Sequence, residues 1–110
     1  MVTRDTSVFH AIADPTRRAI LDRLREGGQA VNEIAGCFEV SRPAISKHLR
    51  VLHEANLVTE TRRGRNRIYK LNAEPLRDLE KWLDHYRRFW ALNLLSLKNH
   101  VESKEKGRKQ

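Results

Sequence analysis

The chain has 110 residues, of which 33% are charged and 39% hydrophobic, enough for one compact domain and too little for two. Its 22 Lys and Arg residues against 14 Asp and Glu residues give a formal net charge of +8, so we expect an acidic partner, nucleic acid first. The sequence has no apolar run of membrane-spanning length, its first residues lack the apolar core of a secretory signal, and its single cysteine excludes an internal disulfide. These features predict a cytoplasmic protein without a membrane segment.

Two helices are predicted at the start of the chain. Apolar residues recur at helical spacing within residues 6–13. Asp14 followed by Pro15 is typical of an N-cap and a first helical position, so a second helix begins there. Gly27 and Gly28 end that helix.

A short third helix is expected over residues 32–38, with Ile34 and Phe38 facing inward. Cys37 lies beside Phe38, so we expect its thiol to pack rather than to act as a redox sensor. Glu39 and Val40 then form a tight turn.

Ser41 has the character of an N-cap for a further helix, over residues 41–55. At 100° per residue, Ile45, Leu49 and Leu52 form one apolar stripe, which leaves the other side of the helix free. Two helices joined by a tight turn, the second with a polar and basic free face, predict a helix-turn-helix whose second helix can enter a DNA major groove. The candidate DNA-binding residues on this helix are Arg42, Pro43, Ser46, Lys47, Arg50 and the bordering His48.

A two-stranded hairpin is predicted next, over residues 58–63 and 67–71 with a turn at 64–66. Val58 and Ile68 are expected to face inward. Residues 41–70 hold eight basic and two acidic side chains, a net charge of +6, which indicates a wing that contacts phosphates. Edge protection of the sheet is the alternative reason for these charges. The candidate DNA-binding residues of the wing are Arg62, Arg63, Arg65, Asn66 and Arg67.

A long amphipathic helix is predicted over residues 74–97. Its apolar stripe is too large to stay in water, so we expect it to form a homodimer interface with the first helix, although an intramolecular core role is the alternative. The candidate interface residues are Phe9, Ile12, Leu79, Trp82, Leu83, Tyr86, Phe89, Trp90 and Leu94.

The predicted fold is therefore mainly α with a small β-hairpin, a winged helix-turn-helix. Residues 1–97 would form one DNA-binding and dimerisation domain, with a DNA-binding core at about 15–71 and the dimerisation helix at 74–97. The basic tail, residues 98–110, has no apolar periodicity, so we expect it to be frayed or disordered.

Taken together, segments 9–21, 41–52 and 55–58 and the Arg-Gly-Arg turn at 63–65 resemble the ArsR/SmtB-type winged-helix repressors of bacteria. One departure is Asn56, where the family commonly has Gly, and Asn tolerates the same left-handed conformation. The resemblance implies a homodimer that binds a palindromic operator in double-stranded DNA and represses transcription, often from its own promoter.

Many members of that family sense metals, but the known ligand positions are not filled in this sequence. The thiolate motif of the third helix aligns with Ala30 and Asn32 in place of its cysteines. The site on the final helix needs Asp and His two residues apart, whereas Asp84 and His85 are adjacent and about 100° apart on a helix. The segment 82–90 resembles the ending of a branch without known metal sites, and we expect neither metal nor cofactor.

Two other functions stay open at this point. An inducer could act on the repressor, either a metal held by His85 together with a residue of the second chain or a small apolar molecule between the long helices. A nonspecific architectural DNA binder would also use a charge of +8. An enzyme is not expected, because the sequence has no nucleophile-base-acid set, glycine-rich phosphate loop or paired carboxylates with a cleft signal.

Overall fold

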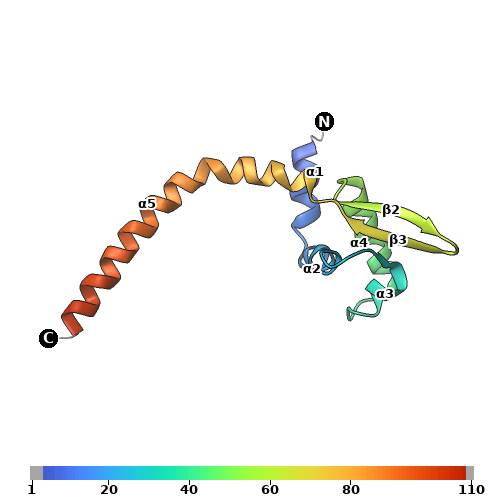
Figure 1. Cartoon of the computed structure of the whole chain (residues 1–110), viewed down its shortest axis with the longest axis horizontal. Helices are drawn as coiled ribbons and strands as arrows, with labels where there is room; N and C mark the ends of the chain where they lie inside the picture. The colour runs from blue at the N-terminus through green and yellow to red at the C-terminus, as the bar shows by residue number, and fades with distance from the viewer. Residues whose placement is uncertain (1–3, 109–110) are drawn as a thin grey trace. The chain divides into compact units, whose positions relative to one another are not determined.

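The computed structural model describes residues 4–108, and their side chains within residues 7–93. The chain divides into two units, Met1–Leu79 and Glu80–Gln110. Within the first unit, helices α1 to α4 gather beside a small antiparallel sheet (Figure 1). The second unit is part of one helix, α5.

Helices α1 (Arg4–Ile12) and α2 (Pro15–Leu24) meet at a tight corner. The Asp14 carboxylate accepts a hydrogen bond from the Arg17 backbone N–H at 3.0 Å, which confirms the predicted N-cap of α2. The Arg17 side chain turns back and donates to the carbonyl oxygen of Ala11 at 2.7 Å, and Arg18 donates to that of Ile12 at 2.7 Å. These two arginines supply donors that the C-terminal carbonyls of α1 lack within the helix.

Helix α3 (Val31–Ala35) is shorter than predicted, because the chain turns at Gly36. Cys37 follows this turn and is exposed, with its thiol donating to the Glu33 carbonyl oxygen at 3.2 Å, so the expectation that it packs was wrong. Phe38 packs against the core, as predicted. Cys37 lies beyond the last residue of α3, so the helical spacing expected over 32–38 does not place its side chain.

Helix α4 (Arg42–Glu54) has the predicted start. The Ser41 hydroxyl accepts a hydrogen bond from the Ala44 backbone N–H at 3.3 Å. The helix ends in a Schellman motif, in which the Asn56 N–H bonds to the His53 carbonyl and the Leu57 N–H to the Leu52 carbonyl, both at 2.9 Å. Asn56 has φ of 61°, the left-handed conformation expected of it.

The sheet has three strands in the order β1-β3-β2, where a two-stranded hairpin was predicted. Strands β2 (Val58–Arg63) and β3 (Asn66–Leu71) form the expected hairpin, and β1 (Gln29–Ala30) pairs with β3. Two residues are too short to show alternation, so the sequence pattern did not reveal β1. The Gly28 backbone lies so close to β3 that an added Cβ would come within 2.8 Å of the Lys70 Cγ.

The register of the hairpin decides which side chains face the core. Val58 lies opposite Leu71, and Thr61 opposite Ile68. Side chains alternate along a strand, so Val58 and Ile68 project from opposite faces of the sheet. Tyr69, with 7% of its surface exposed, is the buried residue of β3 in place of Ile68.

The core of the first unit lies among α1, α2, α3, α4 and the sheet. Each helix contributes one apolar side, and the sheet contributes one face. The fully buried large side chains include Ile20, Ile34, Ile45, Leu49, Leu52 and Leu57.

The predicted long helix is a 3-10 turn, η1 (Glu74–Leu76), followed by α5 (Arg77–Arg108). The helical backbone continues beyond residue 97, where the tail was expected to fray. Residues 98–106 are mostly polar, and Lys and Glu are the commonest among them. Both are good helix formers even where the helix has no apolar stripe. Among the described residues no helix has the length and apolar character needed to cross a membrane.

Candidate nucleic-acid interface

Helix α4 presents two sides of different chemistry. Ile45, Leu49 and Leu52 have no measurable exposure and fix this helix to the core. The predicted free face is exposed, which leaves its side chains available to a partner. Its exposed residues are Arg42, Pro43, Ser46, Lys47 and Arg50.

A cleft of about 330 Å³ lies between this face and the wing. Helix α4 contributes Arg42, Ser46 and Arg50 to it, and the hairpin contributes Arg65 and Arg67. The cleft therefore brings the two basic segments that were predicted separately along the chain to one concave surface. Its other lining residues are Ala30, Val31, Asn32, His53, Glu60, Asn66 and Tyr69.

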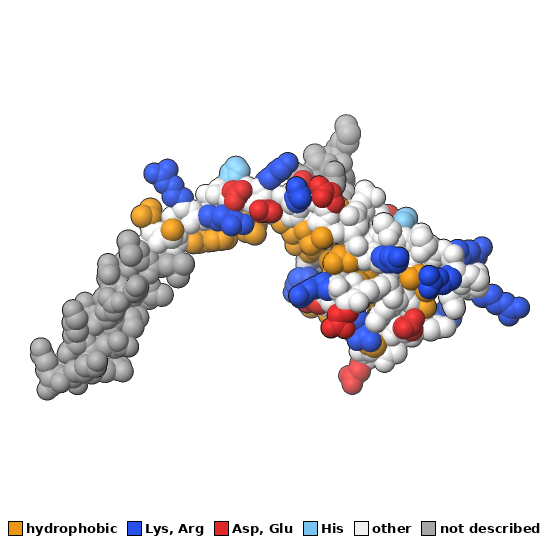
Figure 2. All heavy atoms as spheres, in the orientation of Figure 1, with side chains coloured by type: hydrophobic (Ala, Val, Ile, Leu, Met, Phe, Trp, Pro, Cys, Tyr) orange, Lys and Arg blue, Asp and Glu red, His pale blue; other side chains and the backbone are white. Residues whose placement is uncertain are grey.

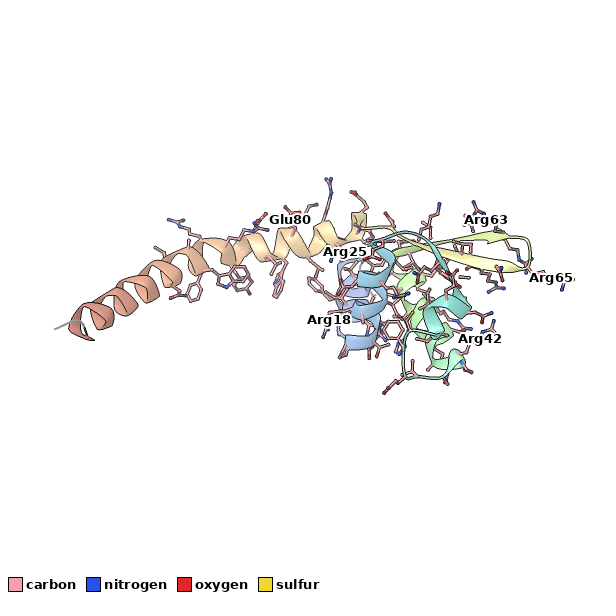
Figure 3. All side chains as sticks on the ribbon, turned by 60° about the horizontal axis from the view of Figure 1, so that its bottom comes forward. Arg18, Arg25, Arg42, Arg63, Arg65 and Glu80 are labelled. Carbon is pink, nitrogen blue, oxygen red and sulfur yellow. The ribbon has the colours of Figure 1, made fainter. Side chains whose placement is uncertain are left out.

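The wing carries its charges at the open end of the hairpin. Gly64 adopts φ of 64°, a left-handed turn position that favours glycine, and Arg65 follows it at the tip. Arg62, Arg63 and Arg65 are exposed, and Lys and Arg side chains gather around this end of the molecule in Figure 2. Figure 3 shows Arg63 and Arg65 on the hairpin and Arg42 at the start of α4.

Arg67 differs from its neighbours on the wing. Its Nε lies 3.3 Å from a carboxylate oxygen of Glu60 on the adjacent strand. The pKa of Tyr69, beside this pair, is raised first by burial and then by the negative charge of Glu60. The arginine is therefore already paired with an acid in the free protein.

His48 is not among the residues that line the cleft. Its Nδ1 lies 3.3 Å from a guanidinium nitrogen of Arg17 and 3.9 Å from the Asp14 carboxylate, and its side chain is 22% exposed. The ring therefore contacts the start of α2. The sequence had predicted a position at the border of the recognition face of α4. Its predicted contact with a phosphate remains a prediction.

Six cleft residues were not predicted from the sequence: Ala30, Val31, Asn32, His53, Glu60 and Tyr69. Two of them carried a usable signal. His53 follows Arg50 by three residues and so shares its side of the helix, and Glu60 precedes Arg62 by two and so shares its face of the strand. The contribution of Asn32 depends on the packing of α3 against α4, which spacing along the chain does not encode.

The candidate dimer interface falls mostly on α5. Trp82, Tyr86, Phe89 and Trp90 are 42% to 62% exposed. The centroid of the Tyr86 ring lies 5.3 Å from that of the Trp82 ring and 6.3 Å from that of the Trp90 ring. The three rings therefore form a continuous apolar strip. Hydrophobic side chains run along one side of this helix in Figure 2.

Four of the remaining five predicted interface residues are less exposed. Phe9, Ile12, Leu79 and Leu83 are half-buried, and the side chain of Leu94 lies outside the described residues. Leu92, which was not predicted, is 64% exposed.

No group of three or more His, Cys, Asp or Glu side chains suited to a metal ion occurs among the residues whose side chains are described.

The chain is similar to known DNA-binding regulators of transcription. A helix-turn-helix domain profile matches residues 12–61. The chain is 43% identical over 77 residues to the transcriptional repressor SdpR of Bacillus subtilis, a match that covers 70% of this chain and 86% of that protein. This chain belongs to the ArsR/SmtB family. As a member of the ArsR/SmtB family it is a DNA-binding transcriptional regulator, and its named relatives are regulators of transcription rather than enzymes.

Solved ArsR-family structures share the winged helix-turn-helix fold. A crystal structure of an ArsR-family transcriptional regulator has a TM-score of 0.73 and 34% identity, and the match covers 81% of this chain and 98% of that one. The solution structure of a homodimeric winged helix-turn-helix DNA-binding domain from Mycobacterium bovis, a possible ArsR-family regulator, has a TM-score of 0.61 and 27% identity, with 91% and 83% covered.

Proposed function

We propose that this protein is a homodimeric repressor that binds an inverted-repeat operator in double-stranded DNA. The observation that carries the proposal is the cleft between α4 and the wing, which is lined by Arg42, Arg50, Arg65 and Arg67. Four guanidinium groups against the single carboxylate of Glu60 leave this concave surface with a net positive charge, which favours the binding of a polyanion. Residues 15–71 would form the DNA-binding core and residues 74–97 the dimerisation helix.

In this proposal α4 enters the major groove. An α-helix with its side chains is about 10–12 Å across, and the groove is about 12 Å wide. Arg42 and Ser46 lie in the first half of α4, the part of a recognition helix that reaches base edges. Arg42 and Lys47 would read bases, and Arg50 would contact the backbone.

The wing would contact the adjacent DNA backbone or minor groove. The end of the hairpin carries three exposed arginines, Arg62, Arg63 and Arg65, whose charges the hydrophobic core does not require. Contacts of this kind position the protein on the duplex and carry little sequence information. They would supply much of the affinity and most of its salt dependence.

Dimerisation would give the protein two such surfaces. The strip formed by Trp82, Tyr86 and Trp90 leaves large aromatic rings in water in a single chain, and burial against a second copy would remove that cost. The homodimeric structure from Mycobacterium bovis supports the same assembly here. A two-fold dimer matches two half-sites about one DNA turn apart, roughly 34 Å.

A salt titration tests the interface. Binding of a random-sequence duplex is measured by fluorescence anisotropy from about 0.05 to 0.3 M salt for the wild type, Arg50→Ala, Arg65→Ala and Arg88→Ala. The slope of log affinity against log salt is negative, and each cleft variant should make it less steep by about one. Arg88, exposed on α5 outside the cleft, is the matched loss of one positive charge and should leave the slope nearly unchanged. Equal changes in all three variants would contradict the proposed interface.

A further inference from the structure

The DNA-facing cleft contains one carboxylate. Of the twelve residues that line it, Glu60 alone is acidic, and four are arginines. A carboxylate in a surface suited to phosphates opposes the function proposed above, so its position calls for a physical explanation.

The strand register brings Glu60 to Arg67. Glu60 lies opposite Tyr69, and Arg62 opposite Arg67, so all four side chains share one face of the hairpin. Glu60 and Arg67 are diagonal neighbours on that face, with 3.3 Å between the Arg67 Nε and a Glu60 carboxylate oxygen. The Glu60 side chain is 30% exposed and that of Arg67 57%, so the acid is the more enclosed partner.

The ion pair changes what Arg67 can offer to DNA. A phosphate that recruited Arg67 away from Glu60 would leave the carboxylate unpaired beside the negatively charged backbone. A phosphate that approached the intact pair would meet a group of no net charge. In both cases the attraction is smaller than that of a free guanidinium such as Arg65 at the tip.

We propose that Glu60 is a positioning residue that withholds Arg67 from the DNA backbone and thereby weakens sequence-independent binding. This role rests on the proposed function of the cleft. The wing then contacts the backbone through Arg62, Arg63 and Arg65, and Arg67 stays on its own hairpin. Weaker binding to any duplex leaves a larger share of the operator affinity to the base contacts of α4.

The test is the salt dependence of binding to a random-sequence duplex by Glu60→Gln. Glutamine has the shape of glutamate and lacks its charge, so Arg67 becomes free. The variant should bind about five- to tenfold more tightly near 0.15 M salt, and its slope of log affinity against log salt should steepen by about 0.9, the value for one added phosphate contact. Glu80→Gln, on α5 outside the cleft, makes the same change in net charge and should not change the slope.

The double variant Glu60→Gln with Arg67→Gln separates the ion pair from a general charge effect. It replaces a pair of no net charge by two neutral amides, so its slope should return to that of the wild type. Thermal unfolding of each variant checks that the hairpin still folds. An unchanged or shallower slope in Glu60→Gln, or an equal steepening in Glu80→Gln, would overturn the role of Glu60.

The same titration distinguishes the two proposals. If Arg65→Ala leaves both affinity and slope intact, the cleft is not the DNA surface and the function proposed for it fails. If Arg65→Ala weakens binding as expected and Glu60→Gln has no effect, the interface stands and only the role of Glu60 is wrong.

Discussion

The Nδ1 of His48, on α4, lies 3.3 Å from a guanidinium nitrogen of Arg17, on α2. The same arginine donates to the carbonyl oxygens of Ala11 at 2.7 Å and His10 at 3.0 Å, at the end of α1. One side chain therefore connects a helix proposed for the dimer interface to the helix proposed for the major groove. The contact with His48 therefore links α4 to the corner between α1 and α2.

Arg17→Ala should lower the free energy of unfolding by about 1–2 kcal/mol, because it removes a charged donor from the partly buried hydrogen bond to the Ala11 carbonyl oxygen and another from the exposed one to His10. The measurement is urea unfolding followed by circular dichroism. Arg23→Ala, in the same helix, loses only an exposed hydrogen bond to Gln29 and should change stability by less than about 0.5 kcal/mol. Similar losses in both variants would show that Arg17 has no special part in the corner.

Asp14 predicts a dependence of stability on pH. Its pKa is lowered first by the hydrogen bond from the Arg17 backbone, against the raising effect of burial, and further by the charges of His48 and Arg17. A carboxyl group whose folded pKa lies below its unfolded value of about 3.9 stabilises the fold above that value. This stabilisation is lost as the pH falls through the folded pKa.

Asp14→Ala should therefore cost about 1 kcal/mol near pH 7, the usual value of an N-cap, and progressively less below about pH 4. The measurement is the difference in urea midpoint between the wild type and the variant from pH 7 to pH 2. Asp14→Asn keeps a capping oxygen without a titratable group and serves as the control. A difference that stays constant over the whole range would contradict the assignment.

Substitutions of Asn56 test the Schellman motif that ends α4. Its φ of 61° is a conformation that glycine adopts freely and alanine disfavours. Asn56→Gly should leave stability within about 0.5 kcal/mol of the wild type, and Asn56→Ala should lower it by about 1 kcal/mol. Thermal unfolding of the two variants measures the difference, and the reverse order would be inconsistent with the Schellman motif.

Tyr86, at the centre of the aromatic strip, tests the proposed dimer. Tyr86→Glu places a charge between Trp82 and Trp90 and should convert a dimer to a monomer of 12.9 kDa in sedimentation equilibrium at about 10 µM. Arg88→Glu, about 160° from Tyr86 around the helix by its 100° steps, should leave the dimer intact. Dissociation by both variants, or by neither, would argue against this interface.

Local patterns predicted helix α4 and the hairpin well. Ser41 and the stripe through Ile45 and Leu49 act within one helix, so their signal is complete in the sequence. Features that depend on contacts between distant segments were not predicted. Strand β1 exists because β3 pairs with it, and the placement of Tyr69 in the core depends on the register of the hairpin.

The candidate site shows the same division. The arginines of α4 and the wing stood out as charge along the chain, but their meeting in one cleft required the packing of the hairpin beside the helix. The pairing of Arg67 with Glu60 and the turn of His48 toward Asp14 also arise between elements. The sequence alone does not show which acidic side chain will pair with a given basic side chain.

The most direct test is selection of bound duplexes by the purified protein from a library of random sequence at about 0.15 M salt. We expect an inverted repeat with half-site centres about one helical turn, roughly 34 Å, apart, and a changed base preference within each half-site when Arg42→Ala replaces the wild type. Recovery of sequences no different from the starting library would contradict this expectation and would indicate a nonspecific architectural DNA binder.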